Sequence, residues 1–235
     1  MNQTIAANDP ISLGDARAAE LHARDLQLLA HLRQAAEARD PGVASHMLRI
    51  SQYTRLIATG MGLGHSEQET VLAATVLHDI GELGVPDAIL EKSDSLTPEE
   101  FLVVRGHVHH GFAILRHGTS ALVRTAAQVA LRHHEKFDGS GYPDGLRGST
   151  IPLYARIAAV ADVFDALTSH RPHRVAFELD CGLDYLRSQR GRHFDPDCVD
   201  AFLAGEARIR GIRSRYRDGF DERLTEAERR PAFGA

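Results

Sequence analysis

The sequence of 235 residues contains no tryptophan and only two cysteines, Cys181 and Cys198. Two thiols this far apart are too few for a disulfide framework and lack the close spacing of a cysteine metal pair. No uninterrupted apolar run reaches the roughly 18 residues needed to cross a bilayer, and the amino terminus has neither a basic start nor an apolar signal segment. These absences exclude a disulfide-stapled scaffold and predict a cytoplasmic protein without a membrane partner.

An excess of positive charge is also missing. The chain has 27 Lys and Arg against 32 Asp and Glu, which gives a formal net charge of -5. This balance argues against indiscriminate binding to nucleic acid, so we predict no DNA partner and a local site for any nucleotide ligand. The hydrophobic content of 43% and the charged content of 25% are ordinary for a soluble globular protein. The length suffices for one large domain with a sizeable core.

Strand-like alternation, internal repeats and low-complexity linkers are absent, and the dominant hydrophobic period is helical. An all-α fold is therefore predicted. Residues 206–230 carry interleaved charges of both signs, which are typical of a solvated helix or a frayed tail. Helices are expected over 15–39, 43–61 and 66–78, from a capping box at Thr97 through His107, over 120–134, from Pro152 through Asp165, over 176–189 and from Asp195 onward.

Histidine, in contrast, is abundant, with 14 copies in the chain. The pairs His78-Asp79 and His133-His134, together with Asp162, supply the nitrogen and oxygen ligands that borderline divalent metals prefer. Both pairs fall at predicted helix C-termini, where the backbone leaves the regular helix and two consecutive side chains can face one ion. Because a carboxylate has two oxygens, Asp79 could bridge two ions about 3.5 to 4 Å apart, as in two-metal phosphoesterases.

Three short motifs resemble those of the HD-GYP family, which hydrolyses the bacterial second messenger cyclic di-GMP. They are HDIGE at 78–82, HHE at 133–135 and GYP at 141–143. The matching stretch runs from about residue 32 to residue 202, with the motifs in family order and spacing. The resemblance implies an HD-domain helical bundle over 32–205, preceded by an N-terminal helical extension over 1–31 and followed by a charged C-terminal helix or tail over 206–235.

The resemblance also implies the roles of individual residues. Seven positions match the family's metal ligands: His46, His78, Asp79, His107, His133, His134 and Asp162. They imply a binuclear centre of two divalent ions, for which iron or manganese is favoured and nickel is compatible. The substrate-binding positions are Arg171, Arg174, Gly141, Tyr142 and Pro143. The predicted catalytic residues are Asp79, which would orient the attacking water, and Glu82.

Two positions depart from the family pattern. Glu82 stands where the family usually has lysine, which reverses the local charge. A glutamate there could act as an extra metal ligand, or it could repel a phosphodiester unless a metal lies between. We therefore expect an altered affinity or rate before complete inactivity. Gly42, four residues before His46, stands where trimetallic members carry glutamate, which favours two metals.

The predicted function is that of a metal-dependent phosphodiesterase that converts cyclic di-GMP to linear pGpG, with further cleavage to GMP left open. One alternative is a low-turnover sensor that binds cyclic di-GMP or pGpG, which Glu82 motivates. A second is a signalling module that docks a GGDEF-domain protein through the loop at Tyr142. A phosphohydrolase for another nucleotide is a broader alternative, because metal chemistry is indifferent to the base. Homodimer formation is left open.

Overall fold

The computed structural model describes residues 43–92, 94–169 and 176–216, together with four helical positions at Arg24, Gln27, His31 and Gln34. The expected helix over 15–39 otherwise lies outside the described residues. Within them the structure is all α-helical, as predicted, and has an isolated β-bridge but no strand. No helix in this part of the chain is long and apolar enough to cross a membrane.

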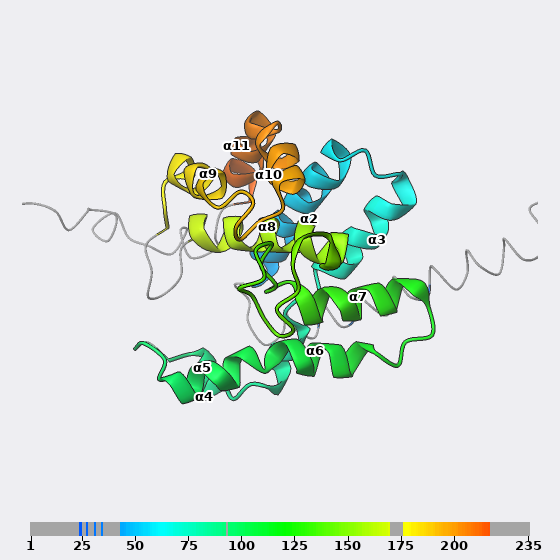
Figure 1. Cartoon of the computed structure of the whole chain (residues 1–235), viewed down its shortest axis with the longest axis vertical. Helices are drawn as coiled ribbons and strands as arrows, with labels where there is room; N and C mark the ends of the chain where they lie inside the picture. The colour runs from blue at the N-terminus through cyan, green and yellow to red at the C-terminus, as the bar shows by residue number, and fades with distance from the viewer. Residues whose placement is uncertain are drawn as a thin grey trace, which may run out of the picture.

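Most of the helices follow one another with short connections, and a longer loop joins α7 to η2 over residues 133–147 (Figure 1). In chain order they are α2 (Val43–Gly60), α3 (His65–Thr75), the 3-10 helix η1 (Ile80–Gly84), α4 (Asp87–Leu90), α5 (Pro98–Arg105), α6 (His107–Leu115), α7 (Ala121–Arg132), the 3-10 helix η2 (Gly148–Thr150), α8 (Leu153–Thr168), α9 (Leu179–Ser188), α10 (Pro196–Leu203) and α11 (Glu206–Arg215).

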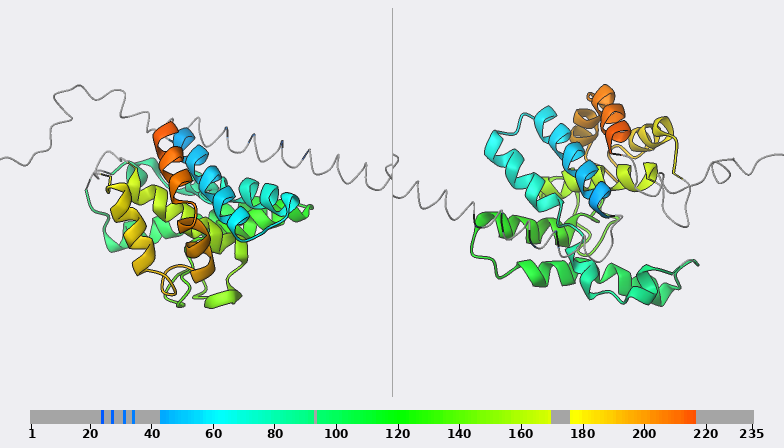
Figure 2. Two further views of the ribbon diagram at one scale, coloured as in Figure 1. Left: turned by 90° about the horizontal axis from the view of Figure 1, so that it is seen from above. Right: turned by 180° about the vertical axis from the view of Figure 1, so that it is seen from behind.

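Helix α8 runs through the middle of the molecule between two groups of helices (Figure 1). On one side lie α2, α9, α10 and α11, and Figure 2 shows α11 alongside α2. On the other side α6 packs against α7, while α3 contacts both α2 and α7. Because α8 touches both groups, a side chain on α8 can meet side chains from either one.

The core on the α2 side is built around three aromatic rings. Tyr53 lies 5.3 Å from Phe164 and 5.5 Å from Phe202, edge to face, and the two phenylalanine rings are 4.9 Å apart. All three side chains are fully buried. Large apolar rings in this arrangement contribute both buried area and favourable ring geometry. This cluster fixes α2 and α10 against α8.

A second core, between α3, α6 and α7, consists mainly of small residues and leucines, and it includes Ala158 of α8. One close approach in it depends on glycine. A Cβ atom on Gly81 would lie 1.9 Å from the carbonyl oxygen of His107 and 2.4 Å from the nitrogen of Gly111. The absence of a side chain at Gly81 therefore lets η1 lie directly on α6, which brings Asp79 next to His107.

Local sequence signals set several helix starts as predicted. Thr97 and Glu100 form the expected capping box: the Thr97 hydroxyl accepts from the Glu100 amide at 3.2 Å, and the Glu100 carboxylate accepts from the Thr97 amide at 2.8 Å. Ser120 caps α7, and Asp195 caps α10. Each such cap satisfies backbone donors that the helix itself leaves unpaired, and it is worth about 1 kcal/mol.

The prediction that one helix runs from Thr97 through His107 is wrong. Helix α5 ends at Arg105, and His107 is the first residue of α6. The chain tightens at Gly106, whose amide lies 3.0 Å from the Val103 carbonyl and 3.2 Å from the Leu102 carbonyl. A Cβ atom on Gly106 would lie 2.9 Å from that Val103 oxygen, so glycine permits the tight turn. Similarly, the helix expected over 66–78 stops at Thr75 and continues as turns over 76–79.

Candidate metal centre

The structure brings together all seven side chains predicted as metal ligands, although they come from segments far apart in the sequence. They form two adjoining groups, and within each group the nitrogen and oxygen atoms lie within 4.8 Å of one another. The three-histidine group consists of Asp79, His107, His133 and His134, and the two-histidine group consists of His46, His78, Asp79 and Asp162. Asp79 belongs to both groups.

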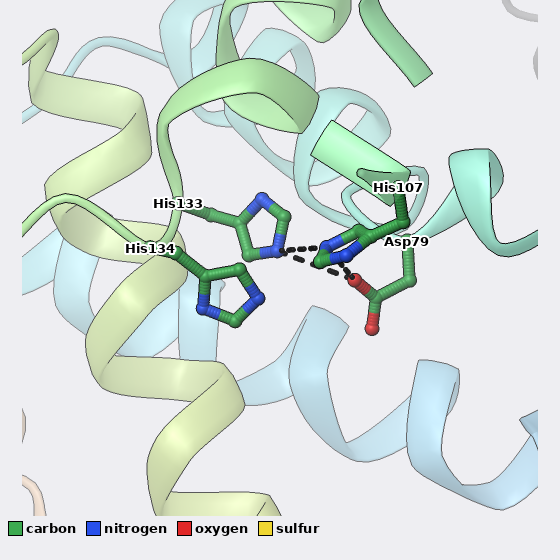
Figure 3. A group of neighbouring side chains, drawn as sticks. All are labelled: Asp79, His107, His133 and His134. Carbon is green, nitrogen blue, oxygen red and sulfur yellow. Dashed lines mark hydrogen bonds and ion pairs between the residues drawn. The ribbon is translucent and has the colours of Figure 1, made fainter. Parts of the chain in front are cut away.

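The two oxygens of Asp79 face different groups. Its Oδ1 lies 3.3 Å from His107 Nε2 and 3.2 Å from His133 Nε2 (Figure 3). These two nitrogens are themselves 3.3 Å apart, and the His134 ring lies next to them, 4.0 Å from the His133 ring. The other oxygen of Asp79, Oδ2, lies 3.0 Å from His78 Nε2. The carboxylate therefore has the placement that a bridge between two ions requires.

Three of the histidines are oriented by backbone carbonyl groups one helical turn earlier. In each case the carbonyl can only accept, so Nδ1 carries the proton and Nε2 presents its lone pair to the centre. The pairs are His78 with Thr75 at 2.8 Å, His107 with Val104 at 2.7 Å, and His133 with Val129 at 3.1 Å. Partners of this kind fix the tautomer and ring orientation of metal-ligating histidines.

His46 is oriented by a carboxylate instead. Its Nδ1 donates to Asp165 at 2.8 Å, and Asp165 also accepts two hydrogen bonds from Arg49, at 2.5 and 2.9 Å. Burial opposes ionisation of Asp165, but the hydrogen bonds from His46 and Arg49 outweigh it and hold its pKa below the usual value. Neither Arg49 nor Asp165 was predicted to have a role from the sequence. A signal existed: each lies three residues after a predicted ligand, His46 or Asp162, on the same helix face.

The donor atoms and charges at the centre suit a bound cation. The His78 Nε2 atom is buried, lies 3.0 Å from Asp79 and 3.6 Å from Asp162, and makes no hydrogen bond within the described part of the chain. Burial alone would lower the pKa of His78, but the negative charges of Asp79 and Asp162 raise it well above its usual value. The lone pairs of the imidazole nitrogens and of the carboxylate oxygens repel one another unless a positive charge lies between them. This set of donor atoms therefore fits divalent metal ions.

Access to the centre lies on the side of Asp79. Its side chain is 34% exposed, whereas those of His107 and His133 are 4% and 0% exposed. Burial and the neighbouring His133 lower the pKa of His134 to about 2, so this ring stays neutral and can act as a ligand. A substrate would therefore approach the Asp79 carboxylate from solvent, with the imidazoles behind it.

The loop that follows His134 is held in shape by a buried glutamate. The two carboxylate oxygens of Glu135 accept from the amides of Asp144 at 2.8 Å and Leu146 at 3.0 Å. Gly141 must be glycine here, because a Cβ atom would lie 2.2 Å from the Lys136 nitrogen. Glu135 belongs to the HHE motif but had no predicted role, and its hydrogen bonds in the structure fix the loop.

This loop places Tyr142 against the centre. The Tyr142 ring stacks on His134 with ring centroids 4.8 Å apart, and its amide donates to the His134 carbonyl at 3.2 Å. The Cζ atom of Arg105, at the end of α5, lies 4.0 Å from the centroid of the same ring. Burial raises the pKa of Tyr142, so its hydroxyl stays protonated. Pro143 follows in the same half-buried loop.

Other predicted site residues are not brought into either group. Glu82 is half-buried in η1 and belongs to neither group. Burial alone would lower the pKa of His107, but the negative charge of Asp79, with a smaller contribution from Glu82, raises it. Arg171, Arg174 and Gly42 lie outside the described residues.

Comparison with known proteins identifies the family. The family model described as HD domain matches residues 30–198, which is more than half of the chain. The chain belongs to the HD domain family. The fold class and the resemblance that the motifs indicated are thereby confirmed.

Relatives of this HD domain carry named activities. It is 45% identical over 193 residues to the cyclic di-GMP phosphodiesterase response regulator RpfG of Xanthomonas campestris pv. campestris, covering 82% of this chain and 51% of that protein. It is 38% identical over 184 residues to 3'3'-cGAMP-specific phosphodiesterase 2 of Vibrio cholerae, covering 78% and 35%. The solved cyclic GMP-AMP specific phosphodiesterase V-cGAP3 of V. cholerae matches with a TM-score of 0.50 and 30% identity, over 77% of this chain and 41% of that one. The HD domain thus spans about half of these relatives or less.

Proposed function

We propose that this chain is a metal-dependent phosphodiesterase that hydrolyses a cyclic dinucleotide, with cyclic di-GMP as the first substrate to test and linear pGpG as its first product. The observation that carries the proposal is the position of Asp79, whose two oxygens face two separate histidine groups. The relatives support the substrate class, because those named act on cyclic di-GMP or 3'3'-cGAMP. Further cleavage to GMP is a second step that the product analysis would detect.

Two divalent ions are the proposed cofactors, with iron or manganese first and nickel as the next choice. His107, His133 and His134 would hold one ion, His46, His78 and Asp162 would hold the other, and Asp79 would be shared. A set of imidazoles and carboxylates without thiolate suits these metals. When bound, such ions lower the pKa of a water molecule and neutralise charge that develops on a phosphoryl group.

The residues of the chain then divide the remaining work. Asp79 is more exposed than Asp162, the other carboxylate of the centre, so it is the group placed to orient the attacking water. Glu82 places a negative charge near His107 and lowers the affinity for a phosphodiester. The loop with Gly141, Tyr142 and Pro143 forms one wall of the site. Arg171 and Arg174 are proposed to bind the dinucleotide through their planar guanidinium groups.

The test is turnover of cyclic di-GMP by protein purified without oxygen and loaded with iron or manganese, with pGpG and GMP resolved as products. We expect metal-dependent release of pGpG, and we expect Asp79→Asn to lower kcat by at least about 100-fold, because it removes the carboxylate that both groups share. Cyclic di-AMP and 3'3'-cGAMP run in parallel would rank the substrates. If no cyclic dinucleotide is cleaved with any of these metals, the proposal is wrong.

Glu82 motivates a second candidate, a sensor that binds cyclic di-GMP or pGpG with little turnover. Glu82→Lys distinguishes the two readings, since it restores positive charge near His107. A faster variant would assign Glu82 a rate-tuning role in an enzyme, whereas tight binding without turnover in both proteins would favour the sensor. Docking of a GGDEF-domain protein through the loop is less well supported, because the Tyr142 ring already contacts His134 and Arg105.

A further inference from the structure

A guanidinium group that no sequence motif indicated lies beside the candidate metal centre. Arg105 is the last residue of α5, two positions before His107, and its Cζ atom lies 4.0 Å from the centroid of the Tyr142 ring. Tyr142 in turn stacks on His134, with planes inclined by 26°. The tyrosine ring thus links Arg105 directly to a candidate metal ligand.

The donors of Arg105 are available for a ligand. Within the described part of the chain the Arg105 side chain makes no hydrogen bond or ion pair, and the aromatic rings that it contacts are those of Tyr142 and, at 5.9 Å, Phe101. A guanidinium has five N–H donors around its edge, so a ring against its face leaves those donors exposed. Stacking therefore holds the side chain in place without using its hydrogen bonds.

The charge of Arg105 complements an anion at this site. The carboxylates of Asp79 and Asp162 lie in the centre, and Glu82 is close enough to affect the pKa of His107. A guanidinium fixed at the edge of such a centre attracts the part of a ligand whose negative charge the metal ions do not neutralise. Its planar fork matches both carboxylate and phosphate, and phosphate is the anion that the proposed substrate carries.

We propose that Arg105 binds the second phosphate of the cyclic dinucleotide, the one that is not cleaved, and that Tyr142 holds its guanidinium in position. The inference rests on the proposed function and deepens it. A cyclic dinucleotide carries two phosphodiesters in one small ring. When the first phosphodiester lies at Asp79, the Arg105 guanidinium, which the Tyr142 ring separates from His134, is placed to contact the second phosphodiester. A simple diester has no second phosphate, so Arg105 favours cyclic dinucleotides over simple diesters.

The test compares two substrates on metal-loaded protein, cyclic di-GMP and bis(4-nitrophenyl) phosphate, which has one phosphodiester. Arg105→Gln removes the charge at similar length. It should raise KM for cyclic di-GMP about 10- to 100-fold, the range for loss of a charge-assisted hydrogen bond, with kcat changed less than about threefold. For the single diester, kcat/KM should fall less than about threefold. Arg105→Lys should recover part of the loss, because it restores the charge but not the fork.

Matched variants separate binding from structure. Tyr142→Leu removes the ring on which Arg105 rests and should raise KM for cyclic di-GMP, while Tyr142→Phe keeps that ring and should raise KM less than Tyr142→Leu does. Arg116→Gln is the control for losing a guanidinium, since Arg116 is exposed at the far end of α6 and bonds to His117. If Arg105→Gln lowers the turnover of both substrates equally, or leaves KM for cyclic di-GMP at the wild-type value, the inference is overturned.

The inference and the proposed function can fail separately. If Arg105→Gln hydrolyses cyclic di-GMP with an unchanged KM, the proposed role of Arg105 is refuted, but the proposed phosphodiesterase function is still supported. If the wild-type protein cleaves no cyclic dinucleotide, calorimetric titration of the metal-loaded protein with cyclic di-GMP decides instead. A Kd raised about 10-fold or more in Arg105→Gln would support the inference without the enzyme, and equal binding would overturn both.

Discussion

At the scale of single residues, the candidate centre depends on side chains that never face it. Asp165 does for His46 what backbone carbonyls do for His78, His107 and His133: its oxygen accepts a hydrogen bond from Nδ1–H, which leaves Nε2 toward the centre. Asp165 is also the partner of Arg49, a guanidinium that is only 1% exposed. Because a buried charge without a partner is costly, this carboxylate serves both stability and orientation.

Asp165→Asn should therefore destabilise the protein and weaken one half of the centre. The amide keeps the shape but removes the negative charge that faces the buried Arg49 guanidinium at 2.5 and 2.9 Å, and breaking a buried ion pair costs about 3 to 5 kcal/mol of unfolding free energy. Denaturant unfolding and metal content per chain measure the two effects. Asp184→Asn is the control, because Asp184 is a 72% exposed partner of Arg187 and should change neither quantity appreciably. Equal destabilisation of both variants would contradict this account.

At the scale of elements, the decisive contact is between η1 and α6. Asp79 precedes η1 and His107 begins α6, so the distance between these two elements sets the distance between two candidate ligands. Backbone atoms limit how closely η1 can approach α6, because a Cβ atom on Gly81 would clash with the backbone oxygen of His107 and the backbone nitrogen of Gly111. Backbone atoms cannot move aside as a flexible side chain can.

Gly81→Ala should separate these two elements. We expect a loss of about 2 kcal/mol or more in unfolding free energy and a lower metal content, because Asp79 moves away from His107. Gly211→Ala is the matched control. Gly211 lies within α11, and a Cβ atom there would meet nothing within 4 Å, so alanine should stabilise the protein by up to about 1 kcal/mol. A Gly81→Ala variant with wild-type stability and metal content would show that the contact is not limiting.

At the scale of the whole molecule, the centre lies between the two helix groups that α8 connects. His46 comes from α2 in one group, His107 opens α6 in the other, and Asp162 lies on α8 between them. Ions held there would cross-link the two cores. Without them, the nitrogen lone pairs and carboxylates of the centre face each other with only protons to balance their charge.

Metal removal should therefore lower the unfolding temperature of the whole domain. A bound ion stabilises the folded state by about 4 kcal/mol when its free concentration is about 1,000 times its dissociation constant. Thermal unfolding with and without a chelator, repeated at several metal concentrations, measures the effect. Asp79→Asn should reduce the difference, since it removes the ligand common to both groups. An unfolding temperature that does not depend on metal would argue against ions in this centre.

Local sequence patterns predicted the helical fold class and many helix starts, and the resemblance to a known family predicted the set of side chains that meet at the centre. These features are local: caps at Thr97 and Ser120 act within one turn, and the His-Asp and His-His pairs mark helix ends where adjacent residues can point inward. Their order and spacing then sufficed to indicate the HD domain, and the comparison confirmed it.

Which residues support that set depends on how distant segments pack in the folded chain. Arg105 lies at the end of α5, whereas the loop that it contacts follows α7. Asp165 accepts hydrogen bonds from Arg49, which lies 116 positions earlier in the sequence. The break at Gly106, which ends one helix and starts another at His107, also depends on how tightly the chain turns there. Contacts of this kind arise from packing between distant segments, and hydrophobic periodicity and capping signals carry no information about them.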